Sequence, residues 1–140
     1  MKALYRVLPV IIWSALIILL STGAGSESYT EKWLSTLLNP AEMRDIDQIN
    51  YLIRKSAHVI QFIIFVVLAW GGISVITKNS IVKFGAVIIS ALLLAGASEA
   101  TQMLFASRTA SILDIAIDAT GIFIGFGIIS LITLAKITRG

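Results

Sequence analysis

The chain has 140 residues, of which 57% are hydrophobic and 14% charged, and its formal net charge is +3. A soluble globular domain of this size needs far more polar surface, so this composition excludes that class. The absence of cysteine excludes disulfides and thiolate metal sites, and the length fits one domain, residues 1–140, without a separate soluble enzyme domain.

Four apolar segments are long enough to cross a membrane, which takes about 20 residues per helix. They lie at about residues 5–24, 56–76, 84–105 and 112–135, and polar or glycine-containing breaks separate them. The sequence therefore predicts an all-α membrane protein with four transmembrane helices in a bundle. Although Lys2 and Arg6 begin the chain as in a signal peptide, the first apolar stretch is longer than signal peptides have, and we expect a retained anchor.

The distribution of basic residues predicts the orientation. With the N-terminus inside, the cytoplasmic segments hold no acidic residue, and their basic residues are Lys2, Arg6, Lys78, Lys83, Lys136 and Arg139. The external loop, at about residues 25–55, mixes both signs of charge. Unopposed positive charge belongs on the cytoplasmic side, so both termini are expected there. Within the loop, residues 30–38 fit either a short surface helix or an ordinary loop with Trp33 at the membrane interface.

Ionisable side chains inside the spans gather near one membrane face. Such residues cost roughly 2.5–3.5 kcal/mol each on insertion scales and normally face the protein interior. From the rise per residue, both Glu99 and Asp118 lie about 9 Å below the outer surface. The candidate ligand-binding residues are Lys55, His58, Glu99, Gln102, Arg108, Asp114 and Asp118.

Helical spacing places these residues on faces that pack against other helices. Asp114, Asp118, Gly121 and Gly125 form one stripe on the fourth span, and the two glycines permit close helix contact. Two surfaces fit this stripe. The third span offers small residues, and the second offers the stripe Lys55, His58, Phe62 and Phe65.

Two interpretations of this polar layer remain open. The acids and bases nearly neutralise one another, so they fit a buried ion network that fixes the register of the helices. Apolar residues would pack a bundle at lower cost, however, and the polar residues are confined to one face. This favours a ligand or reaction site open to the outside.

The order and spacing of these residues resemble the VanZ-like family of bacterial integral membrane proteins. The resemblance covers roughly residues 50–126. It rests on a Lys-xx-His element, a Glu-xx-Gln element, an arginine and an Asp-xxx-Asp-xx-Gly element, here Lys55 and His58, Glu99 and Gln102, Arg108, and Asp114, Asp118 and Gly121. The sequence departs from the family's pattern at two places: Gln61-Phe62 follow the histidine, and Ala106-Ser107 precede the arginine. These departures bear on the fine specificity of the protein more than on its membership of the family. The resemblance implies a multi-pass protein of the bacterial cytoplasmic membrane, linked to the cell envelope and to resistance to the glycopeptide antibiotic teicoplanin.

Three functions compete. The first is binding of a lipid-linked cell-wall precursor or a lipoglycopeptide among membrane lipids, with Lys55 and Arg108 on an anionic head group. The second is a membrane-embedded hydrolase or transferase with catalytic candidates His58, Glu99 and Asp114, and Arg108 as anion stabiliser. The third, ion transport, lacks charged residues in the inner half of the spans.

Cofactors and other partners are weakly constrained. The sequence requires no cofactor, although a divalent ion held by His58, Glu99 and Asp114 or Asp118 is a variant of the enzyme hypothesis. No nucleotide-binding loop, serine-centred elbow or zinc-helix motif occurs. No basic patch for nucleic acid is present, and the sequence leaves open both whether the chain is an enzyme and its oligomeric state.

Overall fold

The computed structural model describes residues 3–22, 32, 36, 46–105 and 112–139. Within these ranges the chain forms four long helices, α1 (Leu4–Ser21), α3 (Ile46–Ile73), α4 (Ser80–Phe105) and α5 (Ile112–Ile137), and no strand. Each helix is long and apolar enough to cross a membrane. The expected all-α fold with four membrane-spanning helices is confirmed. Residues 30–38 with Trp33, apart from positions 32 and 36, lie outside the described part.

Two helices begin earlier than the apolar segments suggest. Helix α3 starts at Ile46 rather than near Ser56, so its first turns occupy part of the segment expected as loop. Helix α4 starts at Ser80 because Asn79 caps it. The Asn79 Oδ1 atom accepts hydrogen bonds from the backbone N–H groups of Ile81 and Val82, at 2.9 and 3.3 Å.

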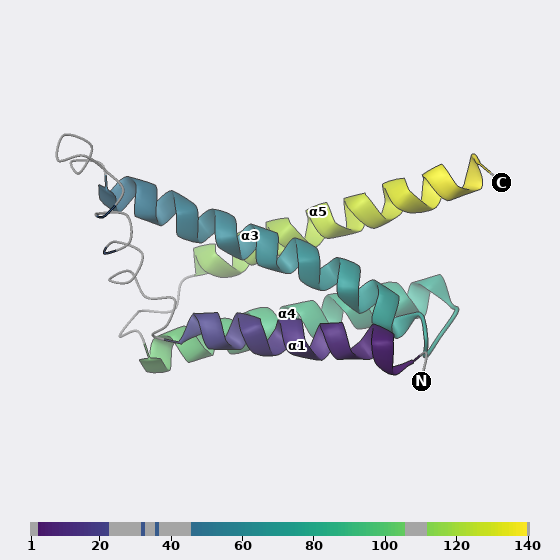
Figure 1. The fold of residues 1–140 in the computed structure, drawn as a ribbon, viewed down its shortest axis with the longest axis horizontal. Helices are drawn as coiled ribbons and strands as arrows, with labels where there is room; N and C mark the ends of the chain where they lie inside the picture. Colours follow the sequence, from purple (N-terminus) through teal and green to yellow (C-terminus); the bar gives the residue numbers. More distant parts are fainter. Residues whose placement is uncertain (1–2, 23–31, 33–35, 37–45, 106–111, 140) are drawn as a thin grey trace.

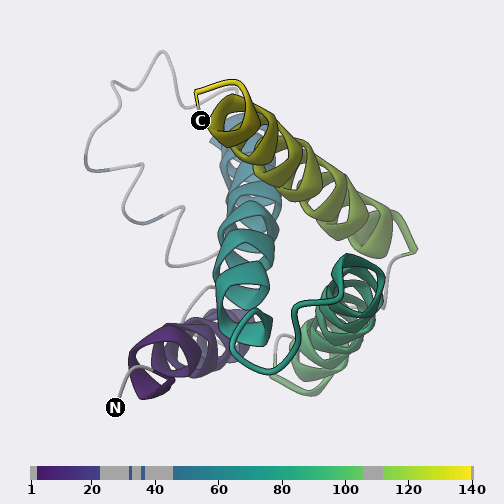
Figure 2. The same cartoon turned by 90° about the vertical axis from the view of Figure 1, so that its right-hand side faces the viewer.

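Helix α3 is the central element of the bundle and contacts each of the other three helices (Figure 2). Helices α1 and α4 run beside one another, whereas α3 and α5 cross (Figure 1). Both chain ends lie at the same end of the bundle, which we call the terminal end. At the opposite end, here the polar end, α1 and α4 finish and α3 and α5 begin.

The glycine stripe of α5 packs against α3, which decides between the two surfaces that the sequence offered. A Cβ atom at Gly121 would lie 2.5 Å from the Val59 carbonyl oxygen, and one at Gly125 would lie 2.8 Å from the Val66 Cβ atom. Only a hydrogen at these positions lets the two backbones approach so closely. In α4, the small residues Ala91 and Ala95 are buried in the core, whereas Gly96 is exposed to open space.

The core lies between the glycine stripe and the apolar faces of α1 and α4. Its buried residues are Ile17, Phe62, Phe65, Val66, Ala69, Val87, Ala91, Ala95, Ile122 and Ile129. An indole hydrogen bond joins α1 to α3, since Trp13 Nε1 donates to the Gln61 carbonyl oxygen at 3.0 Å. This packing fixes the rotation of α3 and α5 and therefore the direction of the polar side chains above it.

Candidate functional site

All four helices contribute polar side chains to the polar end of the bundle. Helix α3 supplies Lys55 and His58, α4 supplies Glu99 and Gln102, and α5 supplies Asp114 and Asp118. Helix α1 adds Ser21. We call this group of seven residues the polar cluster. The structure thus brings together every candidate residue from the sequence except Arg108, which lies outside the described residues.

The first contact of the cluster is an ion pair near its outer edge. The Lys55 ammonium donates to Asp114 Oδ1, and both side chains are partly accessible, with 23% and 16% of their surface exposed. Lys55 also lies over the ring of Tyr51, with its Nζ atom 5.3 Å from the ring centroid. This pair is therefore the part of the cluster that a molecule arriving from this end meets first.

The second contact lies one turn deeper along both helices. His58 Nδ1 is 2.9 Å from Asp118 Oδ1, and the Asp118 side chain is only 4% exposed. The other ring nitrogen, Nε2, is 3.4 Å from Gln102 Nε2 on α4. An aspartate on one imidazole nitrogen fixes the ring orientation and directs the opposite nitrogen inward, as in histidines that act as bases. Glu99 and Asp114 were the candidate catalytic acids from the sequence, but the carboxylate beside His58 is that of Asp118.

Glu99 completes the acidic side of the cluster. It is buried, with 7% of its surface exposed, and both Glu99 and Asp118 attract the Lys55 ammonium electrostatically. Its neighbour Gln102 is also buried, as the shared helical face predicts. In the described part of the chain, the cluster therefore holds three carboxylates, one lysine and one histidine.

Three buried polar residues were not among the site residues predicted from the sequence. Ser21 and Ser98 share a hydrogen bond of 2.6 Å between their Oγ atoms, which joins α1 to α4 beside the cluster. Asn50, with 1% of its surface exposed, lies two turns before His58 on α3. A serine at the end of an apolar run does not by itself indicate a buried contact. Asn50 lies in a segment that the sequence predicted to be a loop. The helical spacing of Asn50, Arg54 and His58 could have indicated that α3 already includes Asn50.

The described side chains do not assemble the divalent-ion site considered for His58, Glu99 and Asp114 or Asp118. Within the described ranges, no three histidine or carboxylate side chains come close enough together to hold a metal. His58, Asp114 and Asp118 are instead engaged in the pairs described above. What the cluster offers chemically is an oriented imidazole, an accessible ion pair and a buried carboxylate.

Comparison with known proteins agrees with the resemblance seen in the motifs. The model of the VanZ/LLP1 family matches residues 6–133, which include α3, α4 and most of α1 and α5. No curated protein and no solved structure matches the chain. On the strength of this match and of its four membrane-spanning helices, the chain belongs to the VanZ/LLP1 family of multi-pass membrane proteins.

Proposed function

We propose that the polar cluster is the head-group site of a protein that binds an amphiphilic envelope molecule in the bacterial cytoplasmic membrane. The ligand class is a lipid-linked cell-wall precursor or a lipoglycopeptide, and its binding would underlie a contribution to glycopeptide resistance. With both termini cytoplasmic, the cluster opens to the outside, where such molecules occur.

The observation that carries this proposal is the gradient of exposure in the cluster. Lys55 and Asp114 are partly accessible, whereas Asp118, Glu99 and Gln102 are almost fully buried behind them. A network that only fixed helix register would need no accessible edge. A site for a polar head group needs groups at its mouth that exchange partners and fixed groups at its base. Lys55 would contact an anionic group, while the carboxylates would accept hydrogen bonds from sugar or amide groups.

The test compares bound molecules, stability and resistance in the same variants. Wild-type protein purified from its own membrane should retain a lipid-linked envelope molecule, detected by mass spectrometry of the extracted lipids. Glu99→Gln should lose it and should lower the teicoplanin resistance of the host while the melting temperature stays close to that of wild type. Met103→Leu is the matched control because Met103 lies on the same helix and is 51% exposed.

A register-fixing ion network predicts a different result. Removing one member would leave buried charges unpaired, at a cost of about 3–5 kcal/mol. Glu99→Gln would then lose stability and resistance together. No lipid-linked molecule should be enriched on the wild type in that case, and the binding proposal would be abandoned.

A second function, hydrolysis or transfer on the same class of substrate, is favoured by one observation. The 2.9 Å contact between His58 and Asp118 orients the imidazole as a general base requires. His58 Nε2 would accept the proton of an attacking water or hydroxyl group, whose oxygen bonds to the substrate, and the leaving group would depart with that proton. Asp118 would act as a positioning residue that stabilises the imidazolium.

Kinetic measurements on variants distinguish this catalytic function from binding alone. With a lipid-linked phosphate substrate, Asp118→Asn should lower kcat by roughly 100-fold or more, the scale of general acid–base catalysis, with little change in KM. Thr120→Ala, an exposed change on the same helix, should have wild-type kinetics. Turnover that is absent in the wild type, or equal in Asp118→Asn, would leave binding as the function.

A further inference from the structure

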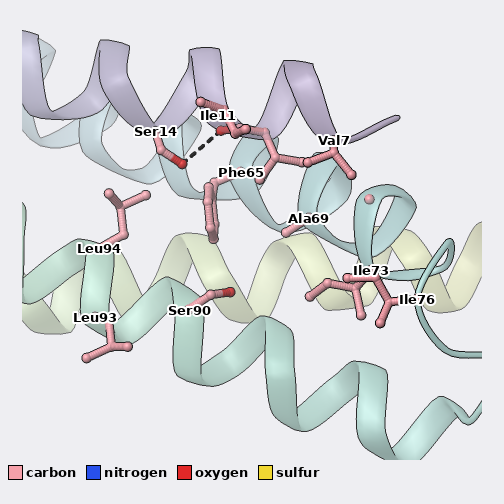
Figure 3. A pocket seen from close by; sticks show the side chains of 12 residues that line it. Val7, Ile11, Ser14, Phe65, Ala69, Ile73, Ile76, Ser90, Leu93 and Leu94 are labelled. Carbon is pink, nitrogen blue, oxygen red and sulfur yellow. Dashed lines mark hydrogen bonds between the residues drawn. The ribbon is translucent and has the colours of Figure 1, made fainter. Parts of the chain in front are cut away.

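A second feature lies at the terminal end of the bundle, away from the polar cluster. A cavity of about 490 Å³ opens between α1, α3 and α4, with Phe65 and Ala69 of α3 as its floor (Figure 3). Two hydroxyl groups border it, but Ser14 donates to the carbonyl oxygen of Val10 and Ser90 to that of Val87, at 2.8 and 3.0 Å. The cavity therefore presents an apolar lining.

A second, basic pocket of about 450 Å³ lies between α1 and the residues that follow α3. Arg6, Tyr5, Ser74 and Lys78 are among the residues that line it. It lies at the same level of the bundle as the end of the apolar cavity, because Arg6 directly precedes Val7, and Val7 lines that cavity. Helix α1 also approaches α3 closely here, since a Cβ atom at Gly72 would lie 3.2 Å from the Arg6 carbonyl oxygen.

The described residues of this end carry positive charge. Among the residues that the structure describes, acidic ones occur only at the start of α3, near the end of α4 and in the first half of α5, so none of these lies at the terminal end. Lys78 Nζ donates to the backbone oxygen of Ser74 at 3.3 Å. Lys83 Nζ is 3.5 Å from Ser74 Oγ and 4.5 Å from the ring centroid of Trp70. Two lysines thus converge on Ser74, directly after α3, and Arg6 lines the same pocket as Ser74 and Lys78.

We propose that these two spaces together form a binding site for one anionic phospholipid. Its phosphate lies between Arg6 and Lys78, and one acyl chain enters the apolar cavity. From Val7 to Ser14 the cavity wall extends about 10 Å along α1, enough to hold part of a chain. Positive charge beside a lateral apolar cavity is the complement of this molecule, whereas a free phosphate would leave the cavity unused. With the orientation expected from the sequence, the lipid comes from the cytoplasmic leaflet.

The head-group part is tested by native mass spectrometry of the full chain in detergent. Wild type should retain phosphatidylglycerol in preference to phosphatidylcholine. Because a basic residue near a membrane surface changes anionic-lipid binding by roughly fivefold, the double variant Arg6→Gln/Lys78→Gln should lose about 25-fold of that preference. Lys136→Gln, which removes an exposed cation at the same end but outside the pocket, should retain it.

The acyl-chain part is tested with a variant that fills the cavity. Ser90→Phe should weaken phosphatidylglycerol retention, whereas Ile89→Phe should not, because Ile89 is 61% exposed on the neighbouring position of α4. Wild type should also bind phosphatidylglycerol more tightly as its acyl chains lengthen, which tests the cavity even if Ser90→Phe does not fold. Equal retention of the two lipids, equal competition by soluble glycerol phosphate, or no dependence on chain length would each overturn the proposal.

Discussion

Replacing Gly121 with alanine should separate α5 from α3. The new Cβ atom would lie 2.5 Å from the Val59 carbonyl oxygen and 3.0 Å from the Phe62 Cβ atom. Carbon–oxygen contacts rarely fall below about 3.3 Å, so the helices must move apart by about 0.8 Å there. A carbonyl oxygen in a helix cannot rotate away as a side chain does. We expect a loss of about 1–3 kcal/mol, the usual range for overpacking.

The same displacement should reach the polar cluster. Val59 follows His58 directly, and Gly121 lies one turn after Asp118. An opening of about 0.8 Å would lengthen the 2.9 Å His58–Asp118 contact to about 3.7 Å, beyond hydrogen-bond distance. Gly121→Ala should therefore reduce both thermal stability and whichever activity the cluster confers, although Gly121 itself carries no polar group.

Gly127→Ala provides the matched control for this prediction. A Cβ atom at Gly127 meets nothing within 4 Å, and alanine stabilises a helix by about 1 kcal/mol relative to glycine. Thermal unfolding in one detergent should give a lower melting temperature for Gly121→Ala and an equal or higher one for Gly127→Ala. Equal melting temperatures for the two variants would refute the close packing of α5 on α3.

Two further predictions concern orientation and the outer ion pair. Cysteines introduced at Ser35 and Asn79 should differ in intact cells, with labelling by an impermeant reagent at Ser35 only; the reverse pattern would invert the topology. Lys55→Met should destabilise the protein because Asp114 loses its partner, whereas Lys55→Met combined with Asp114→Leu should recover much of that loss, since paired replacement removes both charges. Thermal stabilities that are merely additive across this pair would contradict a direct contact.

The sequence was sufficient to predict the four helices and the face of α5 that packs. Long apolar runs specify helical spans because a helix satisfies all of its backbone groups within one segment, as the membrane interior requires, and Gly121 and Gly125 marked the close contact. The beginning of α3 was missed because Asp47, Gln48 and Asn50 lower the local hydropathy, although they are compatible with a helix.

The sequence alone could not predict which residues of the polar cluster contact one another. Spacing placed His58 near the level of several carboxylates, but which one it contacts depends on the rotation of α3 against α5. That rotation is set by the fit of Val59, Phe62 and Val66 around the two glycines. The partnership of Ser21 with Ser98 likewise depends on α1 lying beside α4, which no local pattern specifies.

The distribution of the cluster over the helices has a consequence for biogenesis. Lys55 and His58 are synthesised on α3, but both of their aspartate partners are on α5, the last of the helices to leave the ribosome. While α3 and α4 enter the membrane as a hairpin, the lysine has no aspartate from α5 to neutralise it. Insertion of α5 then supplies both aspartates and the glycine face together, so the two aspartate contacts and the close packing of α5 on α3 form in the same step.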